Sequence, residues 1–156
     1  MIMTLKKLVL LLVITLFSNV LTAQNSSENK AVEKAVLNYI ENFFENNFDV
    51  MNESLHPRLA KRGLNPDGTM SDDLPPQKLK EILNKKKAFP TAGQKNKIEN
   101  VQVFGKMASA TLRTGYPNMK WVEYCHLVKE NEKWKIINIF WDYYPMEKRE
   151  KKQKKQ

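Results

Sequence analysis

The sequence predicts an α+β domain in which three helices, gathered in the first half of the chain, pack on one face of an antiparallel sheet formed by the second half. Apolar residues recur at a helical spacing between Val32 and Phe44, and from Lys97 onward the period changes from near four to two. Helices that precede a run of strands are typical of this fold class. With 156 residues, of which 42% are hydrophobic, the chain is long enough for one domain with a packed core.

The first 23 residues have the layout of a secretory signal peptide. Lys6 and Lys7 precede an apolar run from Leu8 to Phe17, and Ala23 is small enough for cleavage before Gln24. The alternative, an uncleaved membrane anchor, needs a longer apolar run than this one. We therefore expect an exported protein, periplasmic or secreted, that is soluble after cleavage.

Positive charge is concentrated at the two ends of the chain. Of the formal net charge of +9, the first 23 residues carry +2 and residues 147–156 carry +4, which leaves +3 for the domain expected at 24–146. A domain this weakly basic lacks the charge typical of a nucleic-acid-binding protein, so no specific nucleic-acid partner is expected. Residues 147–156 have no apolar period and predict a disordered basic tail that contacts anionic surfaces weakly.

Three helices and one ambiguous segment are expected before the sheet. The first helix has a continuous apolar face and ends at Asn46-Asn47. Pro57 pushes His56 towards an extended conformation and breaks the helical geometry. The basic segment from Arg58 to Leu64 is either a strand or a single turn. The second and third helices are predicted at Phe48 to Leu55 and at about Gln77 to Lys87.

Four strands follow as an antiparallel meander. Strands at Ile98 to Phe104 and Met107 to Thr114 are joined by a two-residue turn at Gly105-Lys106. The last two strands form a long hairpin from Lys120 to Tyr144, whose polar turn is expected at Glu130-Asn131-Glu132.

The final hairpin carries all three tryptophans and predicts a ligand pocket. Alternation separates Trp121, Glu123, Cys125 and Leu127 from Val122, Tyr124, His126 and Val128 in its first strand. In its second strand, alternation separates Trp134, Ile136, Asn138 and Phe140 from Lys135, Ile137, Ile139 and Trp141. Neither strand has one polar and one apolar face, which indicates a sheet covered on both sides, by a dimer partner or by its own curl. Trp121 and Trp141 meet at the free ends of the hairpin, and an aromatic-lined mouth with few polar groups is typical of small-molecule sites.

Two stretches of the chain resemble one known family. They are AVEKAVLNYIENFFENNFDVMNESLHPRLAKRGL and WVEYCHLVKENEKWKIINIFW, and both are similar to the putative lumazine-binding family of the nuclear transport factor 2-like superfamily. The long first helix, the Leu55-His56-Pro57 turn with Lys61-Arg62, and the strand at Trp134-Lys135-Ile136 carry the resemblance, which spans roughly Glu28 to Trp141. It implies a cone-shaped α+β fold with a curved sheet around the first helix, a pocket between them, and frequent dimerisation through the sheet. It implies no single activity, because the superfamily includes isomerases, dehydratases, cyclases and binding modules.

The candidate site residues are aromatic side chains expected around the pocket and two polar groups beside it. His56 lies next to Arg58, Lys61 and Arg62, cations that favour a neutral imidazole able to act as a base. The alternative for His56 is a bond to the backbone or a helix cap. Asp142 follows Trp141 at the end of the last strand, either at the pocket rim or in solvent. The predicted ligand-binding residues are Tyr39, Phe43, His56, Trp121, Tyr124 and Trp141, and the candidate catalytic residues are His56 and Asp142.

The leading hypothesis is an exported domain that binds a small apolar or partly aromatic molecule without strong catalysis. One alternative is an isomerase-, dehydratase- or cyclase-like enzyme that uses His56 or Asp142 as general acid or base. Another is a protein-interaction module that forms a homodimer through its sheet. No metal or cofactor is expected, because the two histidines and the single Cys125 form no ligand motif and the five glycines are scattered. Cys125 lies inside a strand and is expected to be a small buried hydrophobe.

Overall fold

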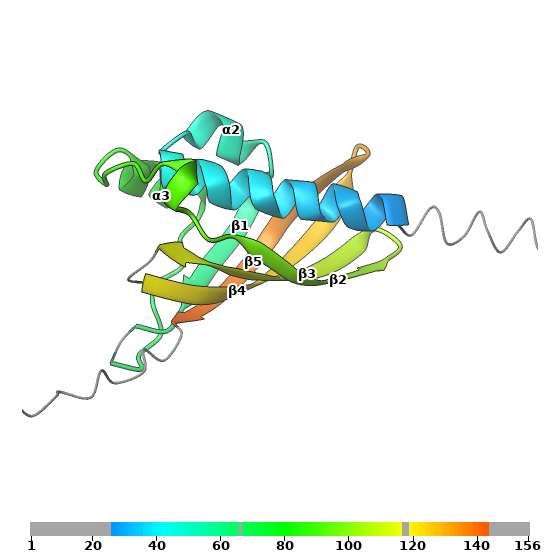
Figure 1. Ribbon diagram of the computed structural model, residues 1–156. Coiled ribbons are helices and arrows are strands. Elements are labelled where there is room, and N and C mark those ends of the chain that lie inside the picture. Colours follow the sequence, from blue (N-terminus) through cyan, green and yellow to red (C-terminus); the bar gives the residue numbers. More distant parts are fainter. Residues whose placement is uncertain (1–25, 66, 117–118, 144–156) are drawn as a thin grey trace, which may run out of the picture.

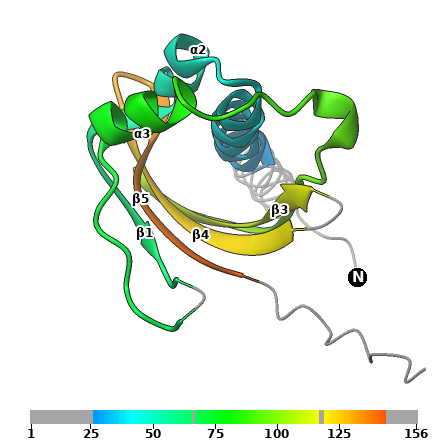
Figure 2. The same ribbon diagram turned by 90° about the vertical axis from the view of Figure 1, so that its left-hand side faces the viewer.

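A computed structural model describes residues 26–65, 67–116 and 119–143 of the protein. These residues form a five-stranded sheet in the order β1-β5-β4-β3-β2, with a long helix lying across its concave face (Figure 1). Seen along that helix, the sheet curves around it, and two shorter helices lie beside its C-terminal end (Figure 2). The strand pairs are antiparallel except for β1 and β5, which run parallel. The predicted α+β class and the curved, mostly antiparallel sheet are confirmed.

The elements follow one another in an order close to the predicted one. They are the long helix (residues 26–45), α2 (Phe48–Asn52), β1 (Leu55–Gly63), α3 (Pro76–Leu83), a 3₁₀ turn (Thr91–Gly93), β2 (Lys97–Phe104), β3 (Met107–Tyr116), β4 (Met119–Glu130) and β5 (Lys133–Tyr143). The signal peptide predicted at 1–23 and the tail predicted at 147–156 lie outside the described residues. Within the part of the chain that the structure describes, no helix is both long and apolar enough to cross a membrane.

The long helix is held against the sheet by the apolar face that its sequence predicts. Five of its side chains are completely buried: Val32, Val36, Tyr39, Ile40 and Phe44. Burial of each large side chain contributes roughly 1.5–3 kcal/mol. At the end of the helix, the Phe44 carbonyl oxygen accepts hydrogen bonds from the backbone N–H of Phe89 at 2.8 Å and from Lys86 Nζ at 3.1 Å. The loop after α3 is thereby fixed to the C-terminal end of the long helix.

The ambiguous basic segment is an edge strand. β1 pairs in parallel with β5 and begins at Leu55, so the predicted second helix is too long and ends instead at Asn52. The extended conformation that Pro57 imposes on His56 suits the start of a strand, and a proline is tolerated at a sheet edge. The predicted third helix is also too long at its C-terminal end, because the lysine-rich loop after Leu83 turns back onto the long helix.

A β-bulge in β5 changes which of its side chains face the helices. Leu127 pairs with Ile136 but His126 pairs with Asn138, so Ile137 is an extra residue in β5. The predicted alternation of this strand is therefore wrong beyond Ile136. Ile139 is buried and Trp141 packs against the core, both on the concave face with Trp134 and Ile136. The bulge explains why the sequence of this strand shows no simple polar face.

Candidate functional site

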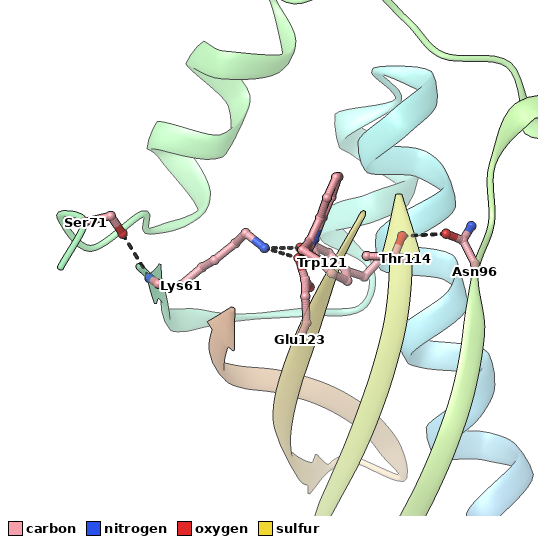
Figure 3. A network of polar contacts seen from close by, with 8 residues as sticks. Lys61, Ser71, Asn96, Thr114, Trp121 and Glu123 are labelled. Atoms are coloured by element: carbon pink, nitrogen blue, oxygen red, sulfur yellow. Dashed lines mark hydrogen bonds and ion pairs between the residues drawn. The ribbon is translucent and has the colours of Figure 1, made fainter. Parts of the chain in front are cut away.

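A charged pair lies buried in the apolar interface between the sheet and the long helix. The ammonium group of Lys61, on β1, contacts the carboxylate of Glu123, on β4 (Figure 3). Lys61 is 6% exposed and Glu123 is completely buried. Because β5 lies between β1 and β4, the lysine side chain spans the concave face to make this contact. Charged side chains are almost never this deeply buried unless they are paired.

Two aromatic side chains complete a hydrogen-bonded cluster around one carboxylate oxygen. Trp121 Nε1 donates to Glu123 Oε1 at 2.9 Å, and the Tyr39 hydroxyl donates to the same oxygen at 3.4 Å. Lys61 Nζ in turn donates to the Tyr39 hydroxyl at 2.8 Å. Burial, followed by the negative charge of Glu123, raises the pKa of the Tyr39 phenol well above its usual range, so Tyr39 stays a neutral donor. We call Tyr39, Lys61, Trp121 and Glu123 the concave-face cluster.

Glu123 and Trp141 each have one buried polar atom without a hydrogen-bond partner among the described residues. These atoms are Glu123 Oε2 and Trp141 Nε1. The two residues are direct partners in the register of β4 and β5, so their side chains are neighbours on the concave face. One acceptor and one donor therefore remain available on adjacent side chains of an otherwise satisfied cluster.

Aromatic rings surround the cluster at one end of the sheet. The rings of Phe89, Tyr116, Phe44, Trp121, Tyr143 and Trp141 contact one another in series, with centroid separations between 4.4 and 6.5 Å. The centroid of the Phe43 ring is 5.8 Å from Lys61 Nζ and 5.0 Å from Lys86 Nζ. Ammonium groups at these distances are attracted to the ring face. Aromatic side chains therefore border the charged pair.

The structure brings together four of the predicted ligand-binding residues. They are Tyr39, Phe43, Trp121 and Trp141. Tyr124 is separated from them, because it lies on the opposite, convex face of β4, where it is 56% exposed and pairs with Thr111 and Phe140.

His56 and Asp142 lie far apart and outside the concave-face cluster. His56 Nδ1 accepts a hydrogen bond from the backbone N–H of Arg58 at 3.0 Å, and its Nε2 is 3.4 Å from Glu130 Oε2. This bond to the backbone is the predicted alternative to a catalytic role. Asp142 is exposed near the other end of the sheet, paired with Val122. From the register of β1 and β5, His56 and Asp142 are separated by roughly 20 Å along the strands.

Sequence reasoning does not identify Lys61 and Glu123 as site residues. A signal for Glu123 is present, since it shares a strand face with Trp121, Cys125 and Leu127, and a carboxylate among apolar residues requires a buried partner. Its partner Lys61 is 62 residues earlier in the chain, in the one segment whose secondary structure is ambiguous from sequence. Only the parallel pairing of β1 with β5 brings the two charges together.

Cys125 is buried on the same face as Glu123, as predicted. Burial, followed by the charge of Glu123, raises the pKa of its thiol, which keeps the sulfur protonated and unreactive. Within the described ranges, no group of three or more histidine, cysteine, aspartate or glutamate side chains is arranged to hold a metal ion.

Comparison with known families matches residues 27–142 to the family described as putative lumazine-binding. The chain belongs to that family. A search of curated protein sequences found none that matches this chain. Its fold is that of nuclear transport factor 2-like proteins, as the solved structures similar to it show.

Three of those solved structures are similar to this family member in fold, although their sequences are distant. A nuclear transport factor 2-like protein of unknown function from Shewanella baltica is 19% identical, with a TM-score of 0.69 over 78% of this chain and 97% of that chain. A second such protein, from Silicibacter pomeroyi, is 13% identical, with a TM-score of 0.68 over 76% and 98% of the two chains. A ketosteroid isomerase-like protein from Erwinia carotovora is 13% identical, with a TM-score of 0.56 over 76% and 98%. At these identities the likeness establishes the fold alone.

Proposed function

We propose that this protein is an exported domain that binds a small, partly aromatic molecule at the concave-face cluster. The observation that carries the proposal is the buried pair of Lys61 and Glu123, held with Tyr39 and Trp121 inside an apolar interface. We assign no role at this cluster to His56 or Asp142, because His56 is bonded to the backbone of Arg58 and Asp142 is exposed near the end of β5.

A buried ion pair is a poor way to stabilise a fold. Removing two charges from water costs several kcal/mol per ion, and well-packed apolar side chains of similar size are often equally good or better for stability. A pair that is kept in spite of this cost is expected to serve binding or specificity. Strongly desolvated groups beside aromatic rings are also the usual composition of small-molecule sites.

The family name supplies the first ligand to test. The matched family is described as putative lumazine-binding, and lumazine is a flat bicyclic heterocycle suited to contact with aromatic side chains. Four of the rings at the site, those of Tyr39, Phe43, Trp121 and Trp141, adjoin the charged pair. We therefore use lumazine as the probe for binding.

The test replaces the charged pair as a unit. In the double variant Lys61→Met with Glu123→Gln, no charge is left buried and the glutamine oxygen still accepts from Trp121 and Tyr39. We expect this variant to fold with a stability near that of the unmodified protein, whereas either single change costs about 3–5 kcal/mol because it leaves one buried charge unpaired. We expect the double variant to lose lumazine binding by at least tenfold, measured by titration of lumazine fluorescence.

Native mass spectrometry of the protein purified from its own host provides an independent measurement. A bound small molecule should be present in the unmodified protein and absent from the double variant. Tyr124→Phe, on the convex face, is the matched control and should leave binding unchanged. A double variant that binds as well as the unmodified protein, or an unmodified protein that carries no small molecule and does not bind lumazine, would contradict the proposal.

Export is proposed from the sequence of the first 23 residues. The expected result is a mature protein that begins at Gln24, which N-terminal sequencing of the protein from the host's extracytoplasmic fraction would detect. We also propose that residues 147–156, with six bases and two acids, bind anionic surfaces weakly. Vesicles containing an anionic lipid should retain the full chain at low salt and release a chain shortened to residue 146.

The convex face favours a second role, association of two copies through the sheet. Its exposed apolar side chains include Phe104 at 80%, Met107 at 59% and Tyr124 at 56% exposure. A row of partners crosses all five strands on this face, from Arg62 through Phe140, Tyr124 and Thr111 to Asn100. Exposed apolar side chains with polar ones around them are typical of interaction sites.

A further inference from the structure

We propose that Glu123 and Trp141 together recognise one edge of the ligand, an edge that carries an N–H group next to a carbonyl oxygen. Glu123 Oε2 accepts from the ligand N–H, and Trp141 Nε1 donates to the neighbouring ligand oxygen. The ligand class is a flat, neutral heterocycle with a cyclic amide or imide edge. This inference rests on the proposed function, because it describes the ligand of the same concave-face cluster.

The register of the sheet puts the two side chains side by side. Glu123 and Trp141 are direct partners on β4 and β5, and the same row continues from Trp141 to Gly63 on β1 and from Glu123 to Leu112 on β3. Directly opposite residues have Cβ atoms about 4.5–5.5 Å apart. Two hydrogen-bonding groups on such neighbours can contact two adjacent atoms of one ligand edge.

The two unpartnered atoms of Glu123 and Trp141 determine which group the ligand must present to each residue. Glu123 Oε1 already accepts from Lys61, Trp121 and Tyr39, while Glu123 Oε2 has no partner among the described residues. An ionised carboxylate only accepts and an indole nitrogen only donates. A buried polar group without a partner destabilises the folded protein, so a ligand that supplies both partners removes two unfavourable contributions at once.

The charge balance of the cluster indicates a neutral ligand. Lys61 contacts Glu123 directly, and both side chains are shielded from solvent, so the pair is neutral as a unit. An additional cation or anion at Glu123 Oε2 would be a buried charge without a counter-charge, which is strongly unfavourable. An amide edge satisfies both free atoms without adding charge.

Gly63 holds the Trp141 indole in the position that this recognition requires. A Cβ atom placed on Gly63 would lie 2.3 Å from Trp141 Cδ2, so the indole lies directly against the β1 backbone. The indole also makes an edge contact with Tyr143, at a centroid separation of 5.2 Å. Phe43, by contrast, is only partly buried, and we infer that its ring moves for a ligand to reach the shielded atoms.

The test compares three lumazines by calorimetric titration. Lumazine and 6,7-dimethyllumazine keep the N–H groups of the pyrimidinedione ring, whereas 1,3-dimethyllumazine has methyl groups in their place. The two dimethyl compounds have the same size, so they separate hydrogen bonding from bulk. We expect 1,3-dimethyllumazine to bind at least tenfold more weakly than the other two. Quinazoline-2,4-dione, which has the same edge on a different second ring, should bind like lumazine.

Variants at Trp141 test the donor. Trp141→Phe removes the indole N–H and should weaken lumazine binding about tenfold or more. If this variant fails to fold, the benzothiophene analogue of tryptophan, incorporated at position 141, keeps the ring shape without the N–H. Trp121→Phe is not a suitable control, because it removes a donor from Glu123 Oε1.

The outcomes separate the two proposals. Equal binding of 1,3- and 6,7-dimethyllumazine, or no loss of affinity in both Trp141 variants, would overturn the recognition by Glu123 and Trp141 while the proposed function stands. Absence of binding by all four compounds, together with a protein that carries no small molecule from its host, would overturn the proposed function and this inference with it.

Discussion

Gly63 lies where the backbone of β1 comes closest to β5. A Cβ atom at this position would be 2.2 Å from the Trp141 carbonyl oxygen and 2.3 Å from its indole ring. Neither a backbone oxygen nor a ring packed between β1 and Tyr143 can move without disturbing the pairing of β1 with β5. The absence of a side chain at this one residue is therefore a requirement of the parallel strand pair.

Gly63→Ala is expected to destabilise the protein by roughly 3 kcal/mol, the upper end of the range for atoms added to a packed core. Urea unfolding followed by circular dichroism measures the change in free energy. Ala60→Ser, on the same strand but not on the Trp141 side, serves as the control and should change stability by less than about 0.5 kcal/mol. A Gly63→Ala variant as stable as the unmodified protein would show that the strands separate easily here.

Individual side chains of the site were predictable only where their own strand or helix has a clear pattern. Tyr39 and Phe43 follow from the helical period, and Trp121 and Trp141 follow from the ends of the hairpin. Lys61 and Glu123 do not, because their contact depends on which strands are neighbours. A charge on an apolar face indicates a partner but does not say which one.

The long helix and the β4–β5 hairpin are connected by one carboxylate. Glu28 Oε1 accepts from Lys129 Nζ at 2.8 Å, and Glu28 Oε2 accepts from Trp134 Nε1 at 2.8 Å. The hydrogen bond from Lys129, followed by that from Trp134, lowers the pKa of the Glu28 carboxyl from its usual value of 4.5. The start of the helix is thus tied more strongly to the turn end of the hairpin while Glu28 is ionised.

The sign of the resulting pH dependence follows from linkage. A carboxyl whose pKa is lower in the folded state stabilises that state above its unfolded pKa, and the contribution is lost as the pH falls through the folded pKa. We expect Glu28→Gln to be less stable than the unmodified protein at pH 7 and the difference to shrink below about pH 4. Thermal unfolding between pH 3 and pH 7 gives this comparison. A difference that stays constant with pH would mean that the ionised form of Glu28 is not what stabilises the contact.

The existence of most elements was predictable, but two features of the sheet were not. β1 lacks a clear alternation, since His56, Pro57 and Arg58 interrupt it, and its parallel partner lies at the other end of the chain. The bulge at Ile137 has no sequence marker, because an isoleucine fits equally well in a regular strand. Both features depend on pairing between strands, which local periodicity does not contain.

At the scale of the whole molecule, the fold class follows from the order of the elements. Helical periodicity in the first half and strand periodicity in the second half predict a layer of helices on a sheet, and the structure confirms it. The family resemblance predicts the curvature of the sheet, which no local pattern indicates. The two faces of the sheet then differ in exposure. Helices cover the concave face, and the convex face is open to solvent or to a second copy.

Association through the convex face predicts a specific mutational effect. Tyr124→Glu places a charge in the middle of this face, and we expect it to weaken self-association at least tenfold without unfolding the domain, because Tyr124 is 56% exposed. Sedimentation velocity over a range of concentrations measures the effect. Gln77→Glu, on α3, makes the same change of charge on the helical side and should leave association unchanged. A protein that sediments as a monomer at all concentrations would contradict the dimer.

The buried pair of Lys61 and Glu123 also restricts how this sequence can diverge. Losing either residue alone leaves a buried charge at a cost of about 3–5 kcal/mol, a large part of the 5–15 kcal/mol that holds a typical domain folded. The pair can therefore be replaced by uncharged residues only if both substitutions arise nearly together, or if the protein is stable enough to stay folded after the first one. Relatives that share this fold are expected to carry both charges or neither.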